Sequence, residues 1–265
     1  MLMTLTVKTW RDHWRAILGW LLGLTAIATV QLAVYPSVRS SAASTSQLID
    51  SLPPAFKTMF RMTDYTSGPG YLGAELFSIM FPLVFIGLGA SWGASATSVE
   101  EERGTADLLL TLPVSRSRVL LAKLVALLTA VTGLGAVLWA VLLVGARMVD
   151  LRIGGPQLAA ACAAVILLGC VYAGVGLLVG AVTGRRAVAL GASVALALAA
   201  FLLYSLGPLV KGLQPWLKVT PFQWALGNDP LRNGLAPGYT GLLVLLSLML
   251  YLLSLVAFQR RDIGT

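Results

Sequence analysis

Residues 100–118 read EEERGTADLLLTLPVSRSR and form a polar-rich segment between two long apolar segments of the chain. This segment contains signals for both the start and the end of a short helix. Thr105 can cap a short helix, and Asp107 in its first turn suits the positive end of the helix dipole. Pro113 ends that helix, because proline has no N–H and disfavours helical geometry at the residue before it. One face of the helix carries, at helical spacing, Thr105, Leu108, Leu109 and Leu112. The passage therefore predicts a two-turn amphipathic helix that touches a partner; a solvated loop whose leucines dip into lipid headgroups is the alternative.

The composition indicates a polytopic membrane protein with an all-α fold. Of the 265 residues, 57% are hydrophobic and 11% are charged, and the mean hydropathy is +0.84. A soluble domain has about 25% charged residues on average. The length suits a single transmembrane domain over residues 1–265. Six apolar segments are long enough to span a bilayer, at residues 16–34, 75–99, 119–145, 157–182, 187–206 and 239–258.

Two local features modify the first two spans. Residues 4–15 carry a cationic face and a face with Trp10 and Trp14, which predicts an amphipathic N-terminal helix lying in the membrane interface. Pro82 predicts a kink in the second span, because proline disrupts the helical hydrogen-bond ladder.

The distribution of cations predicts the orientation. Six spans place both termini on one side of the membrane, and lysine and arginine are denser there than in the longer connections on the other side. The positive-inside rule therefore predicts that both termini and residues 100–118 are cytoplasmic. Nucleic acid is not an expected partner, because the net charge of +8 is spread over span ends instead of one basic patch.

The run from Glu-Arg-Gly-Thr to Leu-Pro-Val-Ser-Arg resembles the cytoplasmic motif after the second span of type-2 ABC transporter permeases. In that family this segment is a coupling helix, which docks on a separate ATPase subunit. The resemblance implies ATPase coupling for Glu102, Arg103, Gly104, Thr105, Asp107, Leu108, Leu109, Leu112, Pro113 and Arg116.

A second stretch resembles the segment before the last span of the same permeases. It comprises Thr220-Pro221-Phe222, Trp224, Leu226-Gly227 and residues 229–235. In that fold the region forms short re-entrant helices near the outer leaflet. Residues 206–210 and 215–219 permit this, because they are apolar but too short to cross the membrane. An ordinary external loop is the alternative.

The resemblance implies the membrane-spanning permease subunit of an ATP-driven exporter in a bacterial plasma membrane. Two permease subunits, identical or homologous, would pair in the lipid, and each would engage an ATPase that binds ATP and Mg. The chain has no G-x-x-x-x-G-K-[ST] phosphate loop, so we expect neither enzymatic activity nor a cofactor in the chain itself. The chain has one histidine, His13, so a His-rich metal site is not expected.

Small residues at helical spacing predict where helices approach closely. In the family, the first and fifth spans meet their counterparts in the partner subunit. The predicted subunit interface is therefore Gly19 and Gly23 in the first span, with Gly191, Ala195 and Ala199 in the fifth. A similar stripe in the fourth span, at Gly169, Ala173, Gly176 and Gly180, is expected to pack within one subunit.

The substrate is not encoded in a recognisable motif, and the path residues are unknown. An aromatic lining built from Trp92, Trp139, Tyr172, Phe201 and Tyr204 would suit a lipophilic drug or lipid, as in multidrug efflux; packing of these aromatic side chains in the core is the alternative. A carrier or channel without an ATPase is the alternative function. Residues 77–98 and 125–143 contain no charged side chain, which disfavours an ion-coupled carrier.

Overall fold

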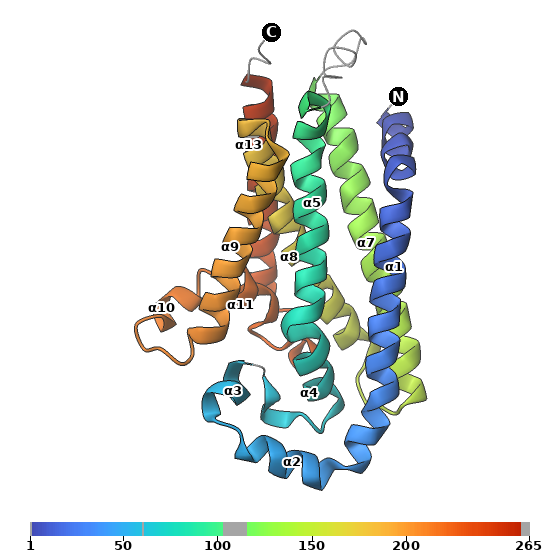
Figure 1. Ribbon diagram of the computed structural model, residues 1–265, viewed down its shortest axis with the longest axis vertical. Helices are drawn as coiled ribbons and strands as arrows, with labels where there is room; N and C mark the ends of the chain where they lie inside the picture. Colours follow the sequence, from blue (N-terminus) through green and yellow to red (C-terminus); the bar gives the residue numbers. More distant parts are fainter. Residues whose placement is uncertain (1, 60, 103–115, 261–265) are drawn as a thin grey trace.

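The computed structural model describes residues 2–59, 61–102 and 116–260, and almost all of them are helical (Figure 1). Six helices in this part of the chain are long and apolar enough to cross a membrane, which confirms the all-α fold with six spans. They belong to α1 (Leu2–Ser40), α5 (Phe81–Glu102) with the helical turns before it, α7 (Arg116–Met148), α8 (Gly155–Thr183), α9 (Arg186–Leu206) and α13 (Pro237–Arg260).

The spans run alternately up and down, so the N-terminus and the C-terminus lie at the same end of the bundle (Figure 1). We call this the terminal end; α5 ends there, α7 begins there, and Gly184 makes the left-handed turn from α8 to α9. The opposite end is called the distal end. It holds the connection from α1 to α5 and the connection from α9 to α13 (Figure 1).

The centre of the bundle is α8, which packs against α5, α7, α9 and α13. Its closest neighbour is α5, because glycines remove the side chains that would otherwise separate the two backbones. A Cβ atom built on Gly89 or Gly93 of α5 would lie 2.2 Å from the carbonyl oxygen of Gly169 or Ala173 on α8, respectively. The small stripe of the fourth span therefore packs within the subunit, as predicted.

The second span begins earlier than predicted, at residue 68 instead of 75. Its first turns are α4 (Gly68–Leu72), where the Ser67 hydroxyl caps the Gly70 N–H, and the π-helix η2 (Gly73–Met80). In η2 the bonding is shifted by one residue, so that the N–H of Phe81 bonds to the carbonyl of Leu76. The irregular turns end where Pro82 removes one N–H from the ladder, so the expected disruption takes the form of a π-helix next to the proline.

The predicted interfacial helix at residues 4–15 is wrong as a separate element. α1 is a single helix of 39 residues that continues from this segment into the first span. The segment packs along the bundle: the Trp10 indole Nε1 donates to the carbonyl of Ala126 on α7, 3.2 Å away, and the His13 ring lies 4.7 Å from the Trp92 ring on α5. Trp10 and His13 therefore contact the subunit's own helices, while Val7 and Trp14 on the apolar face stay exposed.

Short helices fill the two distal connections. The first contains α2 (Ala42–Ser51), α3 (Pro54–Met59) and the 3₁₀ turn η1 (Met62–Asp64). The second contains α10 (Gln214–Leu217), α11 (Pro221–Leu226) and α12 (Pro230–Asn233). Phe222 and Leu226 of α11 are buried, because α11 packs against α8, α9 and α13. The predicted short helices before the last span are therefore present, and their re-entry into the membrane stays a prediction.

Candidate functional site

The predicted coupling segment is bounded by two described helix ends. Glu102 is the last residue of α5, and Arg116 is the first residue of α7. About two turns from these ends, the Lys123 ammonium of α7 donates to the carbonyl of Ala96 on α5, 2.8 Å away, which ties the two helices together. The remaining predicted coupling residues lie outside the described residues: Arg103, Gly104, Thr105, Asp107, Leu108, Leu109, Leu112 and Pro113. Their role stays a prediction.

The five residues of the predicted subunit interface all lie on outward faces of the subunit. A Cβ atom added at Gly19 or Gly23 of α1, or at Gly191 of α9, would have no neighbouring atom within 4 Å. Ala195 and Ala199 are exposed on the same side of α9. The fold leaves these faces open to lipid or to a second subunit, in contrast to the covered glycines of α5 and α8.

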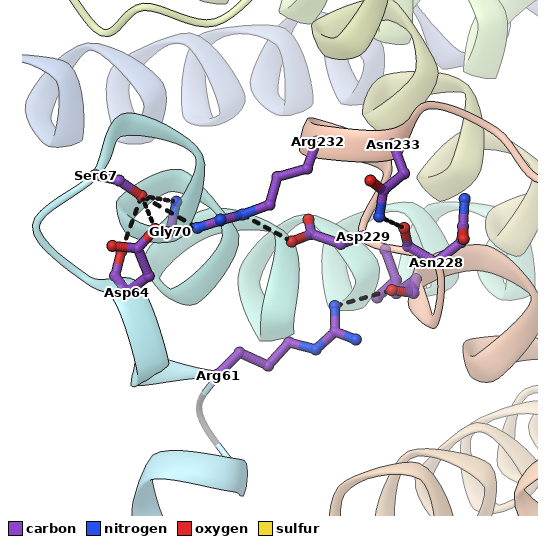
Figure 2. Close-up of polar contacts among 9 residues, drawn as sticks. Arg61, Asp64, Ser67, Gly70, Asn228, Asp229, Arg232 and Asn233 are labelled. Carbon is purple, nitrogen blue, oxygen red and sulfur yellow. Dashed lines mark hydrogen bonds and ion pairs between the residues drawn. The ribbon is translucent and has the colours of Figure 1, made fainter.

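A polar cluster at the distal end joins the two long connections (Figure 2). The Arg232 guanidinium of α12 forms an ion pair with Asp64 of η1, and its Nε lies 3.2 Å from Oδ2 of Asp229. The Ser67 hydroxyl donates to Oδ2 of Asp64 at 2.6 Å and accepts from Nη2 of Arg232 at 3.2 Å. We call the group Arg61, Asp64, Ser67, Asp229 and Arg232 the distal clasp.

Arg61 provides a second contact between the two distal connections (Figure 2). Its Nη1 donates to the carbonyl of Leu226 at the end of α11, 2.9 Å away, and its guanidinium carbon lies 5.3 Å from the centre of the Tyr204 ring on α9. Both Arg61 and Asp229 have positive φ angles, 55° and 50°. Such left-handed backbone is costly for residues other than glycine.

Electrostatics keep the carboxylate of Asp64 charged. Partial burial raises the pKa of Asp64, but the hydrogen bond from Ser67 and the adjacent Arg232 guanidinium outweigh it and lower the pKa below its ordinary value of 3.8. A lowered pKa means that the ion pair stabilises the clasp above the ordinary pKa and is lost as the pH falls through the lowered one. The Asp64–Arg232 pair is therefore fully formed at neutral pH.

A second network connects the same distal segment to the first two spans. Tyr65, next to Asp64, donates a short hydrogen bond from its hydroxyl to the Glu75 carboxylate in η2. Glu75 also accepts from Nε2 of Gln31 on α1 at 3.2 Å, and the Tyr71 hydroxyl donates to Oε1 of Gln31 at 2.8 Å. Burial and the contact with Glu75 raise the pKa of Tyr65, so this hydroxyl remains a donor at physiological pH.

The five aromatic residues of the suggested lining pack mainly within the subunit, and a role on a substrate path stays a prediction. Trp92, Tyr172 and Tyr204 are buried inside the subunit, with 7%, 1% and 9% of their surface exposed. Tyr204 stacks on Phe222 of α11, with 6.0 Å between the ring centroids, and Phe201 lies 5.6 Å from the same ring. Large aromatic side chains in an apolar chain fill the core, so their presence in a span does not place them on a path.

Sequence reasoning missed the distal clasp. Arg232 and Asp64 are 168 residues apart in sequence, and Arg61 and Leu226 are 165 apart. The only sequence signal is that charges of opposite sign occur in both distal connections. Within the described residues, no group of three or more histidine, cysteine or acidic side chains could hold a metal ion. The clusters that the structure does contain are suited to holding helices in place.

The comparisons with known proteins agree with this architecture. A family model described as ABC-2 family transporter protein matches residues 3–263, which is nearly the whole chain. No curated protein matches the chain.

Proposed function

We propose that the chain forms half of the translocation path of an exporter, because it belongs to the ABC-2 family of transporter proteins and is a membrane permease subunit of an ABC transporter. The observation that carries this proposal is the family match over residues 3–263 together with six helices long enough to span a membrane. The chain is the membrane subunit of such a system. The ATPase, with its bound ATP and Mg, would be a separate partner subunit.

Coupling to that ATPase is assigned to the segment between α5 and α7. The two helices that flank it reach the terminal end together and are joined there by Lys123. A force applied between them would therefore be transmitted into α5, which is packed backbone to backbone against the central helix α8. The direct test is to purify the tagged permease from its own cells in mild detergent. An ABC ATPase should be retained on it, and ATP hydrolysis should elute with the complex.

The orientation follows from the same assignment: the terminal end faces the cytoplasm and the distal end faces outward. Ser44 in α2 and Gly212 before α10 are exposed at the distal end. A cysteine at either position, in a chain with Cys162 and Cys170 replaced by alanine, should react with a membrane-impermeant thiol reagent added to intact cells. Labelling that requires cell lysis would contradict this orientation.

The subunit pairs through α1 and α9 in this proposal. Both helices present small residues to the outside, and within the described part of the chain no atom lies within 4 Å of a Cβ added at Gly19, Gly23 or Gly191. Replacing Gly19 and Gly23 together with leucine should separate the paired backbones and shift the purified permease from dimer to monomer. Leucine at Gly133, a glycine of α7 that also has no atom within 4 Å of an added Cβ, is the matched control.

The dimer experiment measures mass by light scattering in mild detergent. A dimer that survives the Gly19 and Gly23 substitutions while Gly133→Leu disrupts it would place the interface on α7. A lipophilic substrate is supported by the apolar side chains that α9 exposes along its length, which include Val188, Val194, Leu198, Leu202 and Leu206.

A further inference from the structure

We propose that the distal clasp is a releasable lock that holds the distal ends of the spans together and must open when the permease opens outward. This inference rests on the proposed export function. It assigns a role to a cluster at the end of the bundle opposite to the coupling segment.

The clasp segment, residues 61–67, touches elements from both ends of the sequence. Asp64 pairs with Arg232 on α12, and Arg61 reaches the end of α11 and the Tyr204 ring on α9. Tyr65 binds Glu75 in η2, which in turn receives a hydrogen bond from Gln31 on α1. One short segment therefore connects α1 and the start of the second span to α9, α11 and α12, which precede the last span in the chain.

The chemistry of these contacts differs from that of the core. The α5–α8 contact is apolar and backbone to backbone, so it cannot separate without leaving a void. The clasp is made of ion pairs and hydrogen bonds whose side chains are partly open to solvent: those of Arg232, Asp64 and Asp229 are 40%, 45% and 39% exposed. Exposed ion pairs are individually weak, and water can replace each partner when the pair opens.

The backbone on both sides of the clasp favours release. Arg61 and Asp229 adopt left-handed φ angles, which cost free energy in residues other than glycine. Opening the clasp would let both residues return to ordinary backbone, which offsets part of the lost ion pairing. Weak contacts between strained segments are suited to a switch that reverses in every cycle.

The test measures a distance across the distal end in the full-length permease, reconstituted in lipid nanodiscs. Spin labels are placed at Ser44, after α1, and at Gly212, after α9, in a chain with Cys162 and Cys170 replaced by alanine. Labelled chains are diluted with unlabelled chains so that only the distance within one subunit is read. The unmodified clasp should give one short distance.

Asp64→Asn and Arg232→Gln should each raise the fraction of a longer distance by about threefold, the range expected for one exposed ion pair. The two substitutions together should do no more than Arg232→Gln alone, because that substitution already removes the pair with Asp64 together with the pair to Asp229. Ser67→Ala removes the hydroxyl that bridges Asp64 and Arg232 and that also caps the Gly70 N–H of α4. It should shift the fraction in the same direction, and it serves if either charge substitution does not fold.

Lys57→Gln is the matched control. Lys57 pairs with Asp50 at 3.4 Å, and both residues belong to the first distal connection, so this pair does not bridge to α12. The control should leave the short distance unchanged. An unchanged distance in the Asp64 and Arg232 variants, or equal widening with Lys57→Gln, would overturn the proposal.

A second measurement separates the clasp from the proposed function. In the complex with its ATPase, ATP with vanadate should move the wild-type permease to the same longer distance. If the isolated variants widen but nucleotide has no effect on the complex, the clasp is supported and ATP-driven export is contradicted.

Discussion

Leu109→Asp is expected to abolish retention of the ATPase by the purified permease. Leu109 lies on the leucine-rich face of the predicted coupling helix, outside every span. Burying an unpaired carboxylate in an apolar groove of the partner costs several kcal/mol, roughly the scale of a hundredfold or larger loss in affinity. Membrane insertion should be unaffected, because residue 109 lies outside every span that the sequence predicts. The measurements are co-purification of the ATPase and ATP hydrolysis by the eluted complex.

The control for this prediction uses the same new charge on another face. Thr111 falls about 200° around the helix from Leu109, so Thr111→Asp adds a carboxylate on the side away from the docking face. It should retain the ATPase at a level close to wild type. Equal loss in both variants would indicate that the charge disturbs the segment as a whole, and normal retention in Leu109→Asp would contradict docking through this face.

Gly93→Ala is expected to be the most destabilising single-methyl substitution in the α5–α8 contact, together with Gly89→Ala. The new Cβ would lie 2.2 Å from the carbonyl oxygen of Ala173, and this neighbour is backbone that no rotamer change can move. Separating two central helices to relieve the clash costs on the order of 3 kcal/mol or more. The thermal midpoint of the permease in detergent should fall by about 10 °C.

Gly87→Ala is the control on the same helix. Its added Cβ would have no atom within 4 Å, so the substitution should leave the thermal midpoint unchanged or raise it slightly, because alanine favours the helix over glycine. A midpoint that falls equally in Gly87→Ala and Gly93→Ala would show that α5 is sensitive to any substitution, and that the close approach to Ala173 is not the cause.

Sequence reasoning was most successful where the signal is local. Hydropathy identified all six spans, because each is a continuous apolar run of the length that a bilayer requires. It placed the start of the second span at residue 75, whereas the helix begins at Gly68. The charged residue Glu75 interrupts the apolar run there, and its partners Gln31 and Tyr65 come from parts of the chain that hydropathy does not connect.

Local sequence patterns failed where an apolar helix face can pack either against lipid or against another helix of the protein. Residues 4–15 have the cation and tryptophan pattern of an interfacial helix, yet Trp10 and His13 contact α7 and α5. An amphipathic face shows that a helix has an apolar partner, and it does not show whether that partner is lipid or protein. The same ambiguity applies to Trp92, Tyr172 and Tyr204, which are buried in the core of the subunit.

The sequence by itself determined the class of the protein, the number of its spans and the family motif between the second and third of them. These depend on composition, on run length and on contiguous residues. Tertiary structure alone decided which small residues meet between helices, such as Gly93 and Ala173. It alone also decided that Asp64 pairs with Arg232, 168 positions away in the sequence. The physical reason is that helix packing and ion pairing depend on the distance between residues in space, which the fold sets and which no local pattern contains.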